Sequence, residues 1–114
     1  MTREEALKLV QEDGFELDNL PEEFKKDKEV VLKAVQKNGV TLEYADDSLK
    51  KDKEIVLAAV QETGYALKHV DDSFKKDREV VLKAVQQWGE DALEYADESL
   101  QNDPDILAIV NKDK

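Results

Sequence analysis

Residues 26–49 read KDKEVVLKAVQKNGVTLEYADDSL, and this stretch decides the fold because it returns along the chain with few changes. The segments KDKEIVLAAVQETG and KDREVVLKAVQQWG begin at residues 51 and 76, and a looser copy, TREEALKLVQEDG, begins at residue 2. The glycine that closes each segment recurs every 25 residues, as Gly14, Gly39, Gly64 and Gly89. Self-similarity at this period predicts an array whose units bury their apolar faces by stacking on one another.

The first half of each unit is predicted to be an amphipathic helix. Its second copy covers about residues 28–38, where the apolar side chains spread over roughly a 200° arc, wide enough for contacts on two sides. Four aspartates stand at the expected N-cap position, namely Asp27, Asp52, Asp77 and Asp103. Thr2 and Glu5 have the spacing of a capping box, and Pro104 suits a first helical position. The glycines are expected just past the helix end in the left-handed conformation.

The second half of each unit is predicted to be a short helix or helical turn, followed by another turn that leads into the next Asp cap. In the second unit its apolar anchors are Leu42, Tyr44, Ala45 and Leu49. Since Leu32 recurs as the same large apolar residue in the later units, Leu32, Leu57 and Leu82 are expected to lie in the core.

The whole chain is therefore expected to form one all-α domain, residues 1–114, with the architecture of a short α-solenoid. It would consist of four two-helix repeats, at about residues 1–25, 26–50, 51–75 and 76–101, and a half-repeat helix at 102–114. One residue is inserted after Gly89. If the final segment has lost one residue near its start, Ile106 aligns with Val31 and the original phase returns.

These repeats closely resemble those of domain-of-unknown-function family 4116. The pattern matches at twelve positions of the second unit: Asp27, Glu29, Val31, Leu32, Ala34, Val35, Gly39, Leu42, Glu43, Tyr44, Ala45 and Leu49. The same columns recur in residues 52–74 and 77–100, and the sequence departs from them at residues 20–21 and 68–70. The resemblance implies tandem helical repeats and implies no activity.

Composition limits the classes of function. The chain has no cysteine, so disulfides, thiolate metal sites and a thiol nucleophile are excluded. The net charge of -11 argues against direct binding of nucleic acid, whose phosphates would be repelled. No apolar run has the length of a membrane span, and residues 1–14 lack the features of a secretion signal. We therefore expect a cytoplasmic protein with no membrane contact, or one delivered to a host by a specialised secretion system.

No residue pattern predicts catalysis, a cofactor or a metal site. The single histidine, His69, occupies the column of Tyr44 and Tyr95 and is interpreted as a half-exposed side chain over an interhelix groove. Acidic pairs such as Asp46-Asp47 lack the spacing of a calcium loop and are interpreted as helix starts. The lysine clusters near residues 26, 51 and 76 are expected to compensate carboxylates of adjacent rungs. The glutamines Gln11, Gln36, Gln61 and Gln86 are interpreted as structural amides, with a polar row on a binding face as the alternative.

The candidate partner-binding residues lie around the inserted residue. Trp88, the only tryptophan, occupies a column that holds Asp13, Asn38 and Thr63 elsewhere, so we expect it to be partly exposed. The alternative is that it packs near Ile106 or Ile109 and seals the end of the array. The acidic candidates that follow it are Glu90, Asp91, Glu94, Asp97 and Glu98.

The sequence thus favours a non-catalytic protein–protein interaction module, monomeric or weakly self-associating, with an unidentified protein partner for which basic character is one option. Two alternatives remain. One is an acidic inhibitor or nucleic-acid mimic that occupies a basic cleft of its target. The other is a structural spacer or a consensus-type repeat array.

Overall fold

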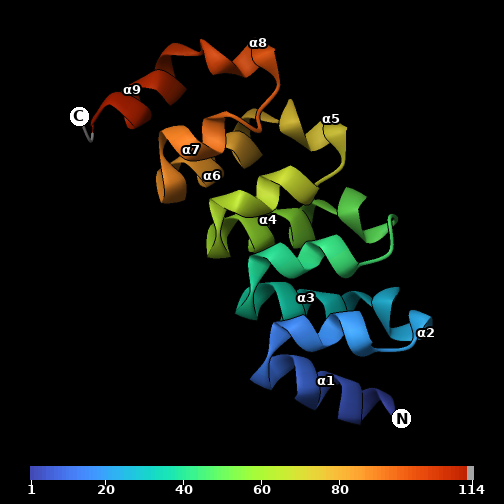
Figure 1. The fold of residues 1–114 in the computed structure, drawn as a ribbon. Helices are drawn as coiled ribbons and strands as arrows, with labels where there is room; N and C mark the ends of the chain where they lie inside the picture. Colours follow the sequence, from blue (N-terminus) through green and yellow to red (C-terminus); the bar gives the residue numbers. More distant parts are fainter. Residues whose placement is uncertain (113–114) are drawn as a thin grey trace.

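The computed structural model describes residues 1–112 as a stack of helical repeats (Figure 1). The repeats follow one another from the N-terminus at one end to the last helix at the other, and the molecule measures 48 × 24 × 17 Å. Every regular element in the described part of the chain is a helix. This architecture is an all-α repeat solenoid, as the sequence predicts. None of the described helices has the length and apolar character needed to cross a membrane.

The long helices of the array begin at side-chain caps. They are α1 (Arg3–Glu12), α3 (Lys28–Lys37), α4 (Lys53–Glu62), α6 (Arg78–Trp88) and α9 (Pro104–Lys112). Asp27 accepts hydrogen bonds from the N–H groups of Glu29 and Val30, and Asp103 accepts them from Asp105 and Ile106 in the same way. The capping box of Thr2 with Glu5 is present in α1. The N-terminal boundaries therefore agree with the sequence prediction.

The second half of each of the first three repeats begins with a 3₁₀ helix. These helices are η1 (Gly14–Asn19), η2 (Gly39–Tyr44) and η4 (Gly64–His69). A single helical turn follows each one, namely α2 (Glu22–Lys25), η3 (Leu49–Lys51) and α5 (Asp72–Lys75). The fourth repeat has the α-helical turns α7 (Glu90–Leu93) and α8 (Glu98–Gln101) instead. Asp46, Asp71 and Asp97 accept hydrogen bonds from Ser48, Ser73 and Ser99, so the acidic pairs do start these turns.

The core is continuous along the stack and is dominated by four columns of the long helices. In α3 these columns are Val30, Val31, Ala34 and Val35, all fully buried. The 3₁₀ helices add Leu17, Leu42 and Leu67, which are also fully buried. The prediction that Leu32, Leu57 and Leu82 are core residues is only partly correct, because all three are half-buried at the edge of this core. The β-branched and alanine side chains of these four columns, rather than the recurrent leucine of the long helices, fill the space between the helices.

The glycines Gly14, Gly39 and Gly64 do not have the predicted left-handed conformation, since the one positive φ among the described residues is at Gly89, at 59°. Their role is a close approach between repeats. A Cβ added to Gly39 would lie 2.3 Å from the carbonyl oxygen of Ala59 in the next repeat, and one on Gly14 would lie 2.4 Å from that of Ala34. Backbone therefore packs against backbone at these joints, and only glycine leaves enough room.

The last joint differs from the others. Helix α6 is one residue longer than α3 and α4, Gly89 caps it, and a Cβ on Gly89 would meet nothing within 4 Å. The prediction that Ile106 of the final helix aligns with Val31 is wrong. The cap on Asp103 places Ile106 in the column of Val30 and Val80, so the shift caused by the insertion persists through the described part of α9.

Candidate functional site

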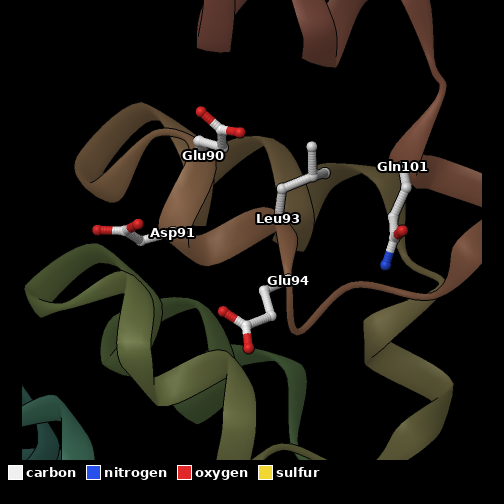
Figure 2. A pocket seen from close by; sticks show the side chains of 5 residues that line it. All are labelled: Glu90, Asp91, Leu93, Glu94 and Gln101. Atoms are coloured by element: carbon white, nitrogen blue, oxygen red, sulfur yellow. The ribbon is translucent and has the colours of Figure 1, made fainter.

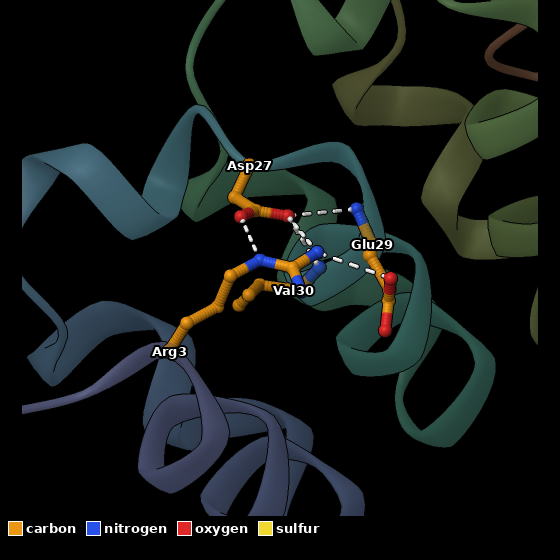
Figure 3. A network of polar contacts seen from close by, with 4 residues as sticks. All are labelled: Arg3, Asp27, Glu29 and Val30. Atoms are coloured by element: carbon orange, nitrogen blue, oxygen red, sulfur yellow. Dashed lines mark hydrogen bonds and ion pairs between the residues drawn. The ribbon is translucent and has the colours of Figure 1, made fainter.

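A ladder of ion pairs joins successive long helices along one edge of the array. Arg3 contacts Asp27 at 2.6 Å and Glu29 at 3.0 Å, which are the cap and second residue of the next long helix (Figure 3). Lys28 holds Asp52 and Glu54 at 3.1 and 2.8 Å, and Lys53 holds Asp77 and Glu79 at 3.1 and 2.9 Å. Arg78 bridges Asp103 and Asp105. The expected charge compensation between adjacent rungs is therefore confirmed for this column.

The ladder also lowers the pKa of the capping carboxyls. The Arg3 guanidinium, followed by the backbone N–H groups of the helix start, lowers the pKa of Asp27 below its ordinary value. At Asp52, partial burial acts in the opposite direction, but hydrogen bonds from Lys28 and from the N–H of Ile55 still lower the pKa. These carboxylates are therefore ionised at neutral pH and take part in the contacts between neighbouring repeats. The ladder thus has a structural role.

A second set of ion pairs lies within single repeats and is missing from the fourth. Lys25, Lys50 and Lys75 contact Glu22, Asp47 and Asp72 at 3.4, 3.5 and 3.2 Å. In the fourth repeat the equivalent of these lysines is Gln101, whose amide donates to the carbonyl of Ala96 at 3.0 Å. Glu98, the counterpart of Asp72, makes no ion pair with any described residue. Residues 90–98 carry five carboxylates and no cation, and residues 1–25 carry eight carboxylates and three cations, so the net negative charge lies toward both ends of the array.

Three of the predicted partner-binding residues line one open hollow of about 350 Å³, together with Leu93 and Gln101. They are Glu90, Asp91 and Glu94 (Figure 2). Asp91 and Gln101 stand at opposite ends of the hollow with Leu93 between them, and Glu94 points away from Glu90 toward the preceding repeat. The structure thus brings these candidates together on one surface.

The other two acidic candidates lie on the neighbouring turn. Asp97 is the N-cap of α8, accepts a hydrogen bond from Ser99 at 3.0 Å, and has its own backbone N–H bonded to the carbonyl of Lys75. The side-chain hydrogen bond from Ser99 lowers the pKa of Asp97. Asp97 is therefore held by the fold, whereas Glu98 beside it is exposed.

Trp88 is partly exposed, at 39% of its surface, as the sequence predicts. Its indole lies over Gly64, where an added Cβ would be 2.2 Å from Cδ1, and its ring centroid is 4.5 Å from that of Tyr65. Tyr65 is itself 38% exposed and also packs edge-on against Tyr95 at 6.4 Å. Trp88 therefore stacks on the repeat before it. The predicted packing near Ile106 or Ile109 stays a prediction, since the contacts with Gly64 and Tyr65 do not test it.

Sequence reasoning did not single out Tyr65. Its column holds Phe15 and Val40 in the earlier repeats, and Phe15 is also exposed, at 44%. The sequence feature that could have identified Tyr65 is the recurrence of an apolar residue directly after the glycine, on the outer side of the 3₁₀ helix. We define the C-terminal surface as Tyr65, Trp88, Glu90, Asp91 and Glu94.

His69 is half-buried, as expected, and lies beside a second hollow shared with Lys50 and Asp71. Partial burial lowers its pKa, although Glu43, whose Oε2 is 3.8 Å from Nε2, opposes this effect. No group of His, Asp and Glu side chains among the described residues is arranged to hold a metal ion.

The recurring glutamines are not the structural amides that the sequence favours. Gln11, Gln36, Gln61 and Gln86 are all exposed, and the hydrogen bonds between repeats are made by other groups. At two joints these groups are Asn38, which accepts from the N–H of Gly14 at 2.9 Å, and Glu62, which accepts from that of Gly39 at 2.6 Å. The glutamines form a polar row along the outer side of the long helices.

The stacked repeats, the ladder and the recurring glycine joints define the class of this protein as a short helical-repeat array. The family model described as "Domain of unknown function (DUF4116)" matches the chain four times in tandem, over residues 2–50, 29–75, 52–101 and 77–108. The chain therefore belongs to the DUF4116 family, as the resemblance of its repeats implies. No curated protein and no solved structure matches it significantly.

Proposed function

We propose that this protein is a non-catalytic binding module that engages a partner protein through the C-terminal surface, and that the partner presents basic groups there. The observation that carries the proposal is the pair of partly exposed rings, Trp88 and Tyr65, together with the stretch that follows Trp88, residues 90–98, which has five carboxylates and no cationic side chain. Large aromatic side chains are enriched among residues that dominate binding energy, and a surface rich in carboxylates attracts cationic partners.

A second function is favoured by the charge of residues 90–98. Five carboxylates over two short turns could occupy a basic cleft of a nucleic-acid-handling protein and act as an inhibitor or mimic of nucleic acid. In that case the carboxylates would supply most of the affinity and the rings little of it. Because exposed charges are screened over about 8–10 Å at physiological ionic strength, binding would weaken steeply as salt rises.

The test is affinity capture from the source cell with the wild-type protein and two variants as bait. One variant is Trp88→Ala, and the other replaces Glu90, Asp91 and Glu94 by Gln, Asn and Gln. A true partner is retained by the wild type and lost by both variants. Trp88→Ala is expected to cost about 2 kcal/mol or more of binding free energy.

A matched control removes three charges elsewhere. Glu12→Gln, Asp18→Asn and Glu23→Gln change exposed side chains at the other end of the array, and this triple variant should bind as the wild type does. A partner that ignores the ring variant and depends on the carboxylates would favour the mimic. A partner that all four proteins bind equally would contradict the proposal for this surface.

A further inference from the structure

We infer that the C-terminal surface recognises an arginine side chain of its partner, in preference to lysine. This inference rests on the proposed function and goes one step beyond it. The feature that carries it is the pair of tilted rings of Tyr65 and Trp88, with centroids 4.5 Å apart, which remain 38% and 39% exposed. Asp91, three residues after Trp88, and Glu94, next to Tyr95, give this surface negative charge, so the occupant is inferred to be a cation.

The two rings are held in place by the fold before any partner arrives. Trp88 lies on Gly64, whose missing side chain leaves room for the indole, and Tyr65 also makes an edge-on contact with Tyr95. The rings come from two different repeats, α6 and η4. A preformed aromatic surface loses little conformational entropy on binding, because the side chains are already ordered.

Carboxylates lie within a short reach of these rings. Consecutive Cα atoms are about 3.8 Å apart, so the Cα atom of Asp91 is no more than about 11 Å from that of Trp88. Glu94 adjoins Tyr95 in sequence and points toward the repeat that carries Tyr65 (Figure 2). An extended segment of three or four residues, at about 3.3 Å per residue, covers this span.

An arginine side chain can interact with both the rings and the carboxylates of this surface. Its planar guanidinium stacks on Trp and Tyr faces, is less strongly hydrated than an ammonium group, and donates hydrogen bonds in a fork that fits a carboxylate. Lysine offers the same charge as a compact, strongly hydrated group and stacks less well. The charge alone would not separate the two residues, so the preference has to come from the rings.

Trp88 also makes the test direct, since it is the only tryptophan and its emission reports on this surface. The probes are two synthetic ten-residue peptides, each with four cationic residues spaced by Gly and Ser, identical except that one carries Arg and the other Lys. We expect the Arg peptide to bind about three- to ten-fold more tightly at physiological salt and to change the emission of Trp88. Binding is measured by calorimetry and by fluorescence titration.

Variants separate the contribution of the rings from that of the charge. Trp88→Leu and Tyr65→Leu should reduce the Arg preference toward equal binding while both peptides still bind at low salt. The carboxylate triple variant should weaken both peptides together, and the Glu12, Asp18 and Glu23 control should weaken neither. Equal affinity for the two peptides, or an Arg preference that persists in Trp88→Leu, would overturn the inference. Neither result would contradict the proposed function, which the capture experiment tests with a natural partner.

Discussion

Three glycines let neighbouring repeats approach until backbone touches backbone. Gly14, Gly39 and Gly64 each face the next long helix at an alanine, whose carbonyl oxygen would lie 2.3 to 2.7 Å from an added Cβ. The same column contains larger residues in the two outer long helices, Leu9 in α1 and Val110 in α9. Alanine therefore occupies this column where a glycine of the preceding repeat packs against the helix. A larger residue occupies it in the helices that no glycine approaches in this way.

Replacing Gly39 by Ala is expected to destabilise the protein by more than about 3 kcal/mol, at or beyond the usual range for overpacking. The new Cβ would overlap a carbonyl oxygen that is held in α4 and cannot rotate away as a flexible side chain would. The measurement is the free energy of unfolding from urea denaturation monitored by circular dichroism.

The control for this variant is Lys37→Ala, two residues earlier and exposed, where a change within about 0.5 kcal/mol is expected. If Gly39→Ala were as mild as this control, the close approach of the two backbones would not be a real feature of the joint.

At the scale of the elements, burial differs sharply between leucines that look alike in sequence. Leu67 in η4 is fully buried, whereas Leu57 in α4 is half-buried. The difference arises because the four buried columns of each long helix already occupy the side that faces the core. The leucine column lies at the edge of that side and closes the core from solvent.

Leu67→Ala is expected to cost about 2–5 kcal/mol of stability, since it removes a large side chain from a fully packed site. Leu57→Ala should cost less, about 1–2 kcal/mol, because part of the side chain is already in contact with solvent. Urea denaturation of the two variants checks the order. A larger loss for Leu57→Ala would mean that the assignment of core and edge is reversed.

Helix starts could be predicted from sequence because the information is local. Asp27 and its equivalents carry their own hydrogen-bond acceptor, and the groups that they cap are two and three residues away. The role of Gly39 could not be predicted in this way, since its reason lies in Ala59 of the next repeat. The same applies to Gln36, for which nothing local distinguishes a structural amide from an exposed one.

In the candidate site, too, the local features could be predicted from sequence and the contacts between repeats could not. The partial exposure of Trp88 followed from the polar residues in its column, and the acidic residues near the insertion were visible in the sequence. The stacking of Trp88 on Tyr65 was not visible, because these residues are brought together by the packing of one repeat on another. The register of α9 was also mispredicted, since it depends on where the inserted residue is absorbed.

At the scale of the whole molecule, the joints between the first four long helices are nearly interchangeable. Each uses one cation on two carboxylates, and each uses a glycine against an alanine carbonyl. The stability of such an array is approximately a sum of repeat and nearest-neighbour terms, with no contacts between distant repeats. A further identical joint should therefore add to stability without disturbing the others.

Inserting a second copy of residues 52–76 directly after residue 76 is expected to give a folded protein with a higher unfolding temperature. The array should lengthen by about 8–10 Å, the usual distance between packed helices. Thermal unfolding and small-angle X-ray scattering measure the two effects. A lower unfolding temperature would show that the joints are not equivalent.

The ladder has a consequence for any comparison with nucleic acid. Each rung sets one cation against two carboxylates, so it retains about one net negative charge, and packed helices are about 8–10 Å apart. The resulting linear charge density is roughly one-fifth of that of duplex DNA, which carries one charge per about 1.7 Å of axis. Counterions would condense far less on this edge than on a duplex. The long edge of the array is therefore a poor electrostatic imitation of DNA, and any such imitation belongs to the five carboxylates of residues 90–98.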